Sequence, residues 1–325
     1  MDVASFCRQS RVLVVAGKGG VGKSTMVAAL ARMAANAGMS VLIVELEGKP
    51  GISAAFDRRG PLLYEESLLA APTASGANAV RARRITPDDA LLEYLADHGL
   101  HRVSKRLLST GVLDVVATAI PGIRDVLVLG KVKGLERDRA ADLILVDAPA
   151  TGHAVTFLTS AGGLLGIARS GPVRTQAAEV DGLLRDPERC RVMLVTLAEE
   201  MPVSETVEAA YQLEDRAGLR LGPVIVNGVA GLPLGLAGDA EAAAGAVGVH
   251  CTDDQLAALN AARRFRLQRA ELEAEQLARL GRELPLPQIR VPALAAPVIG
   301  SAQLDILSDS LARGVADLVP EVPAA

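Results

Sequence analysis

The segment at residues 17–25 constrains the fold of this chain more than any other, because it reads GKGGVGKST. It follows a largely apolar run at residues 11–16 and precedes a helical pattern at residues 26–31. A strand, a glycine-rich loop and a helix in this order form a P-loop, whose backbone N–H groups and helix N-terminus hold phosphate oxygens. The segment therefore predicts an α/β fold that binds a nucleotide.

The residue types of this loop each suit one part of a nucleotide site. Lys23 is expected to reach the β- and γ-phosphates, and the Ser24 hydroxyl to bind Mg²⁺. Lys18 is additional to the usual GxxxxGK[ST] pattern. The residues expected to line the nucleotide are Gly17, Gly19, Gly20, Val21, Gly22, Lys23, Ser24 and Thr25. The alternative is a glycine-rich turn with two solvated lysines, against which the flanking strand and helix argue.

The composition limits the environments in which this chain can function. Its 325 residues suffice for a large core, which must be aliphatic because only 2% of the residues are aromatic. A net charge of −4 argues against binding to nucleic acid, and no apolar run reaches the roughly 18 residues of a membrane span. Cys7, Cys190 and Cys251 lie far apart and form neither a zinc motif nor a disulfide framework. We therefore expect a cytoplasmic protein without zinc and without direct membrane insertion.

Apolar runs alternate with helical patterns along the chain, which predicts a doubly wound, mostly parallel sheet with helices on both faces. The expected strands are residues 11–16, 41–44, 143–146, 191–197 and 223–227, with an edge strand at 289–291. A helix is expected at residues 24–37, and a long one at 253–282 capped by Thr252 or Asp253. We interpret the whole of residues 1–325 as a single P-loop domain.

Two stretches of the chain depart from this alternation. Residues 60–135 carry helical periodicity between the second and third strands, over far more chain than one crossover helix needs. Together with residues 154–185 they predict a helical subdomain inserted into the sheet domain. Residues 228–250, which are rich in Gly and Ala, predict a flexible loop.

Asp147 directly follows the apolar run at residues 143–146, where the carboxylate of a Walker B motif holds Mg²⁺, usually through water. The alternative is a carboxylate that only caps the end of the strand. Pro149, Gly152 and His153 come next and suit a loop that changes conformation with the phosphate. We therefore expect these three residues to form a switch beside the nucleotide.

These motifs resemble those of the ATPases that energise arsenite efflux and of those that target tail-anchored membrane proteins. Both groups belong to the deviant Walker A branch of P-loop proteins, whose first loop is close to the one at residues 17–25. Their second switch reads DTAPTGHT, and residues 147–154 read DAPATGHA. Asn227 matches the asparagine that reads adenine in that family, and Pro292 lies in a segment that resembles its adenine-pocket loop.

The resemblance implies a dimeric ATPase that uses ATP and Mg²⁺. Lys18 would reach the nucleotide of a facing subunit, so that the chain pairs with a copy of itself or with a paralogue. Hydrolysis would relax this dimer and act on a client such as a membrane protein or a transporter. Anion-transport-like and membrane-protein-targeting-like roles both remain open at this point.

The first switch departs from the pattern of the family. Where the family has STDPAH after the second strand, residues 44–51 read VELEGKPG. Glu47 falls at the position of the aspartate that orients the attacking water, and Glu45 is the alternative. A slow or inert switch is the third interpretation. The chain would then be a nucleotide-gated assembly or chaperone module whose output is partner binding.

Overall fold

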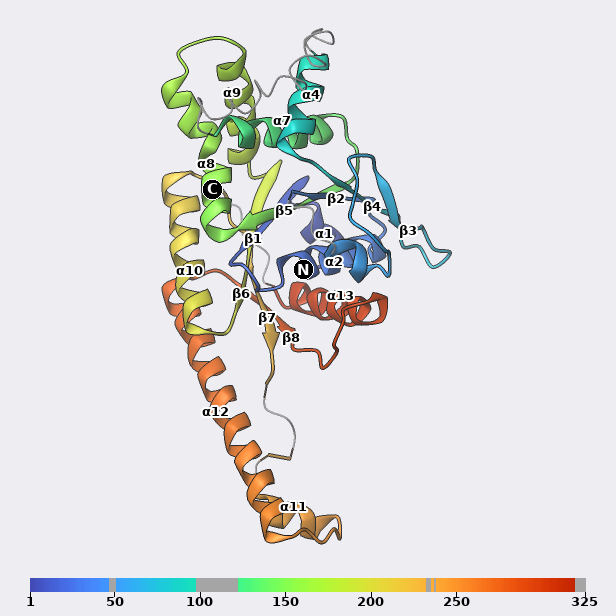
Figure 1. The fold of residues 1–325 in the computed structure, drawn as a ribbon. Helices are drawn as coiled ribbons and strands as arrows, with labels where there is room; N and C mark the ends of the chain where they lie inside the picture. Colours follow the sequence, from blue (N-terminus) through green and yellow to red (C-terminus); the bar gives the residue numbers. More distant parts are fainter. Residues whose placement is uncertain (47–50, 98–121, 232–234, 237, 319–325) are drawn as a thin grey trace.

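A computed structural model describes residues 1–46, 51–97, 122–231, 235–236 and 238–318 of the chain. Its centre is an eight-stranded sheet in the order β3-β4-β2-β5-β1-β6-β7-β8 (Figure 1). Neighbouring strands are parallel except for β3 and β4, which are antiparallel. The strands are β1 (Val12–Gly17), β2 (Val41–Glu45), β3 (Ser67–Ala70), β4 (Val80–Arg84), β5 (Leu143–Ala150), β6 (Cys190–Leu197), β7 (Val224–Val229) and β8 (Gln288–Pro292). The prediction of a doubly wound, mostly parallel α/β sheet is confirmed.

Helices cover both faces of this sheet. The α-helices that the structure describes are α1 (Val3–Cys7), α2 (Lys23–Asn36), α3 (Gly51–Ala55), α4 (Pro87–Asp97), α7 (Ile123–Arg137), α8 (Thr151–Ile167), α9 (Pro172–Arg185), α10 (Glu200–Tyr211), α11 (Ala240–Ala246), α12 (Asp253–Glu283) and α13 (Ser301–Ala316). One buried apolar cluster contains side chains of α7, α8, α9 and α10, and a second contains side chains of α1, α2, α3 and α13. The sheet therefore separates two cores.

Strand β1 lies in the middle of the sheet and contributes to both cores. Val12 and Val14 belong to the cluster with α8, whereas Leu13 and Val15 belong to the cluster with α2. This alternation follows because successive side chains of a strand point to opposite faces. All residues of β1 are buried, which explains why its sequence is apolar without interruption.

The helical stretch expected at residues 60–135 is partly wrong, because β3 and β4 lie within it and extend the sheet beyond β2. Strand β4 reads VRARR, so it contains no apolar run that would indicate a strand. The guanidinium of Arg83 lies 4.4 Å from the centre of the Tyr64 ring, where the aromatic face accommodates its charge. The helices that the structure describes here begin with α4, and α4, α7, α8 and α9 pack on one another.

The flexible loop expected at residues 228–250 is also partly wrong. Strand β7 continues to Val229, and α11 follows with Asp239 as its N-cap, whose carboxylate accepts a hydrogen bond from Ala242 N at 2.8 Å. Alanine is the residue that most favours a helix, so a segment rich in it folds locally once capped.

The long helix expected at residues 253–282 is α12, and Thr252 is its N-cap in a capping box with Gln255. Figure 1 shows α12 extending away from the sheet, with α11 at its far end. Among the helices that the structure describes, none combines the length and the apolar character that a transmembrane span requires.

We expect Leu145→Ala to lower the free energy of unfolding by about 2–5 kcal/mol, because it empties a site at the centre of the sheet. Leu145 is fully buried in β5, whereas Leu68 on the edge strand β3 is 50% exposed. Leu68→Ala is the matched control and should change the same quantity by less than about 0.5 kcal/mol. Urea denaturation of both variants measures the difference, and equal losses would contradict this account of the core.

Candidate functional site

The ends of three parallel strands bring the predicted site residues together. In the sheet, Gly17 of β1 pairs with Ala150 of β5, and Asp147 of β5 lies opposite Val15. On its other side Asp147 lies opposite Glu45, the last residue of β2. Ligands of open α/β sheets bind at the carboxyl ends of the strands. The glycine-rich loop, Asp147 and Glu45 therefore share one such edge.

The glycines of the loop allow contacts that no other residue would permit. A Cβ on Gly17 would lie 2.2 Å from the carbonyl oxygen of Val195 in β6. A Cβ on Gly22 would lie 2.4 Å from Nδ2 of Asn227. Gly20 and Gly22 have φ angles of 88° and 90°, which residues with a Cβ rarely adopt. The loop can therefore approach the sheet closely while Gly19 and Gly20 stay exposed to a ligand.

The loop opens directly into helix α2. Gly22 is the N-cap, and Lys23, Ser24 and Thr25 form the first turn, each of them partly exposed. The Nζ atom of Lys23 donates a hydrogen bond to the carbonyl oxygen of Lys18 at 3.3 Å, across the mouth of the loop. Unpaired N–H groups at a helix N-terminus favour an anion. The lysine ammonium and the helix end thus present positive charge to the same space.

Ser24 and Asp147 lie in direct contact, although 123 residues separate them in the chain. The Ser24 hydroxyl donates to Oδ2 of Asp147 at 2.6 Å, and Asp147 is only 7% exposed. A hydroxyl and a carboxylate beside a phosphate cradle are the oxygen donors that suit Mg²⁺. No group of three or more Asp, Glu, His or Cys that could hold a metal occurs in the described ranges. Phosphate oxygens and waters would therefore have to complete the coordination.

Lys18 forms an ion pair with Glu205 of α10, with its Nζ atom 2.6 Å from Oε1. Both side chains are about one-third exposed, at 32% and 35%. No local sequence signal identifies Glu205 as this partner, because 187 residues separate the two side chains in the chain. The additional lysine of the loop is thus held within its own chain.

Of the two residues expected near adenine, Asn227 lies in β7 two residues before its end, and Pro292 is the last residue of β8. Asn227 donates from Nδ2 to the carbonyl oxygen of Val21 at 2.9 Å, so its amide supports the loop. Pro292 ends β8 opposite Val229, whose carbonyl oxygen accepts from Ala293 N at 3.0 Å. Both residues therefore lie beyond β6 on the same side of β1.

The loop expected at residues 147–153 is wrong, because β5 continues to Ala150 and α8 begins at Thr151. The pairing of Gly17 with Ala150 extends the strand past the last apolar residue. Pro149 is consequently a strand residue, while Gly152 and His153 are exposed in the first turn of α8.

Of the two candidates in the first switch, Glu45 lies within the described residues and Glu47 does not. Glu45 is 2% exposed beside Asp147.

On helix α7, burial raises the pKa of Asp125, and the nearby His153 opposes that rise.

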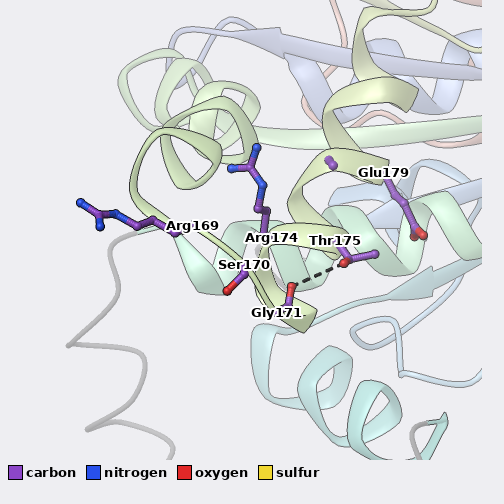
Figure 2. Close-up of a pocket in the computed structure, with 7 residues that line it drawn as sticks. Arg169, Ser170, Gly171, Arg174, Thr175 and Glu179 are labelled. Atoms are coloured by element: carbon purple, nitrogen blue, oxygen red, sulfur yellow. Dashed lines mark hydrogen bonds between the residues drawn. The ribbon is translucent and has the colours of Figure 1, made fainter.

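A surface hollow of about 570 Å³ lies at the other end of α8, where the chain turns into α9 (Figure 2). Its lining residues include Arg169, Ser170, Gly171, Arg174, Thr175 and Glu179. Nη1 of Arg174 donates to the carbonyl oxygens of Leu165 and Ala168 at 2.9 and 2.8 Å. Arg174 thus satisfies the last carbonyls of α8 and joins α8 to α9.

Comparison with known proteins agrees with this geometry. The family model described as anion-transporting ATPase matches residues 10–164, which include the glycine-rich loop and Asp147. This match places residues 10–164 of the chain in the anion-transporting ATPase family. ATPase BagA of Mycobacterium tuberculosis is 40% identical over 224 residues, which are 67% of this chain and 64% of the relative. The chain thus spans somewhat less than two-thirds of the length of that relative.

More distant members of the family match over shorter shares of their length. The arsenical pump-driving ATPase of Escherichia coli is 28% identical over 219 residues, which cover 66% of this chain and 34% of the relative. ATPase get3 of Neurospora crassa is 29% identical over 152 residues, which cover 46% of this chain and 43% of the relative.

We expect Gly22→Ala to destabilise the protein by about 1–3 kcal/mol more than Gly20→Ala does. The two glycines have nearly equal positive φ angles, but only a Cβ on Gly22 meets a side chain, that of Asn227. Urea denaturation measures both changes. In an Asn227→Ala background the difference between the two variants should disappear, and its persistence there would contradict the proposed contact.

Proposed function

We propose that this chain binds and hydrolyses Mg²⁺-ATP as a dimer, and that its nucleotide cycle acts on a client through the helices α4, α7, α8 and α9. The contact between Ser24 and Asp147, 2.6 Å long and next to the glycine cradle, carries the proposal. It joins the first turn of the phosphate-binding helix to a buried carboxylate on the neighbouring strand. The match of residues 10–164 to the anion-transporting ATPase family supports the same activity.

The residues of the site would divide the work of phosphoryl transfer. Loop N–H groups and Lys23 would hold the phosphates, while Ser24 and Asp147 would hold Mg²⁺, which neutralises charge that develops on the phosphate oxygens. A carboxylate of the first switch, Glu47 or Glu45, would orient the attacking water. Glu45 lies beside Asp147 in the sheet, which supports it as one of the two candidates.

The dimer is supported by the additional lysine of the loop. In the family that the motifs resemble, this lysine reaches the nucleotide of the facing subunit. Here Lys18 pairs with Glu205 of its own chain, so the proposed reach requires that this ion pair first be broken. A homodimer and a heterodimer with a paralogue are both compatible with the proposal.

A second candidate function follows from the same ion pair and from the glutamates of the first switch. If Lys18 leaves Glu205 only rarely, hydrolysis is slow and partner binding becomes the output of the nucleotide cycle. Phosphate release, measured beside the ATP-dependent molecular mass, separates the two candidates. Fast release without a partner favours the enzyme, whereas ATP-locked dimers with little release favour the assembly or chaperone module.

The client is proposed only as a class. One relative is an arsenical pump-driving ATPase, which supports a transporter as the client. The resemblance to targeting ATPases supports a membrane protein instead. A cytoplasmic location would suit either client.

We expect Asp147→Asn to lower the Mg²⁺-dependent ATPase rate on the order of a hundredfold, because it removes the carboxylate charge while keeping the shape of the side chain. ATP binding measured calorimetrically in the presence of EDTA should stay within a few-fold of wild type. Asp142→Asn is the matched control, since Asp142 lies just before β5 and its carboxylate bonds Ser40 instead. Equal rates in wild type and Asp147→Asn would contradict the proposed metal site.

We expect Glu205→Gln to reduce the ATP concentration needed for half-maximal dimerisation by roughly two- to fivefold, since it frees Lys18 from a partly exposed ion pair. Sedimentation at increasing ATP concentration measures this shift. Glu208→Gln on the same helix is the control, because its side chain bonds Gln212 and not the loop. A shift of the same size in both variants would argue against a specific role for Glu205.

A further inference from the structure

Helix α12 forms an arm of 31 residues, about 46 Å long at 1.5 Å per residue. Its buried residues are Ala270, Glu273, Leu277 and Leu280, all in the half that packs on α10. The other half of this fully described helix contacts α11 and contains no buried residue (Figure 1). The arm therefore exposes much of its surface beyond the body of the protein.

A row of small and apolar side chains, which we call the arm stripe, follows the exposed side of α12. It consists of Ala258, Ala261, Phe265 and Leu272. Phe265 is 66% exposed and Leu272 is 57% exposed. Intervals of three, four and seven residues place side chains along one side of a helix and are typical of helices that pack lengthwise on one another. The stripe thus has the spacing of a helix–helix contact, with the polar Gln268 at the position between Phe265 and Leu272.

Two opposite charges border the arm stripe on the same side. Arg264 directly precedes Phe265, and Glu271 directly precedes Leu272. Residues seven apart lie at nearly the same angle around a helix, so both charges lie on one flank of the stripe. Two such helices laid antiparallel, with a two-fold axis near residues 267 and 268, would set Arg264 of each against Glu271 of the other. The charges on this flank of one copy are therefore complementary to those on the same flank of a second copy.

We propose that the arms of two copies of this chain pair antiparallel along the arm stripe. Phe265 of each copy then packs near Leu272 of the other, and the two charge contacts fix the register. This pairing is independent of Lys18 and of the nucleotide, so it goes beyond the dimer of the proposed function. It would keep two subunits together while their nucleotide sites open and close.

The charge pattern favours a second copy over other occupants of the stripe. An anionic lipid surface attracts helices whose polar face is uniformly basic, and the acidic Glu271 and Glu275 on this flank oppose that. An apolar client segment would need no alternation of charge beside the stripe. A two-fold pair uses the arginine and the glutamate equally, as isologous contacts require.

The contact would be small and reversible. It involves one helix from each subunit and two large side chains from each, which is at the low end of specific interfaces. Two weak contacts in one assembly reinforce each other, because the first raises the effective concentration for the second. The arm pair would therefore lower the protein concentration at which the nucleotide-dependent dimer forms.

The test is a charge exchange in the full-length chain carrying Lys18→Ala, without nucleotide, with molecular mass followed by sedimentation across the micromolar range. We expect Arg264→Glu and Glu271→Arg each to weaken self-association about tenfold, since two attractions become two repulsions. An equimolar mixture of the two variants should associate at least as well as the unexchanged chain. Phe265→Ala should also weaken association. Because Phe265 is exposed, this substitution should leave the protein folded.

Arg266→Glu is the matched control, because Arg266 follows Phe265 and lies on the other flank of the stripe. It makes the same change of charge and should leave the association constant within about twofold. A chain that stays monomeric at every concentration would overturn the proposal and leave the stripe to a partner of another chemistry. Failure of the mixture to recover association would overturn it as well. Neither result bears on ATP hydrolysis, so the proposed function is tested separately.

Discussion

The position of β1 between β5 and β6 is the constraint on which the rest of the structure depends. Pairing on both sides fixes where the glycine-rich loop leaves the sheet, and the same pairing sets Asp147 near Ser24. Two cores bury β1 from both faces, so neither the strand nor the loop can shift without disturbing both. The sheet therefore determines how the glycine-rich loop, Ser24 and Asp147 lie relative to one another.

The loop is held by contacts from several elements even without a ligand. Asn227 supports it from β7, Asp147 supports its helical end from β5, and Glu205 holds Lys18 from α10. Such a loop loses little further freedom when a phosphate binds, which lowers the entropic cost of binding. Of the three contacts, only the one with Glu205 ties down a lysine that the proposed dimer needs elsewhere.

The sequence predicted the central strands, the loop and the long helix because each has a strong local signal. Apolar runs identified β1, β2, β5, β6 and β7, and Thr252 identified the start of α12. Strands β3 and β4 have no such signal, since β4 carries three arginines; Arg81 pairs with Glu66 and Arg83 lies over the Tyr64 ring only in the folded protein. The role of Glu205 and the extension of β5 to Ala150 likewise depend on residues far away in the chain. Helix α13, which packs on α2, was not anticipated, although its buried Leu304, Leu307, Leu311 and Val315 recur at helical spacing.

The distant partners of β1 also determine when the site can form during synthesis. Val12 pairs with Ile144 and Cys190, so β1 cannot complete its pairing until more than half of the chain has been synthesised. Pairing between such distant segments is slow, because the entropic cost of closing a large loop comes before any stabilising contact forms. A nascent chain that ends before residue 143 would carry the nucleotide motif without the neighbours that shape it. Its apolar first strand would remain exposed to aggregation or to chaperones until β5 and β6 emerge from the ribosome.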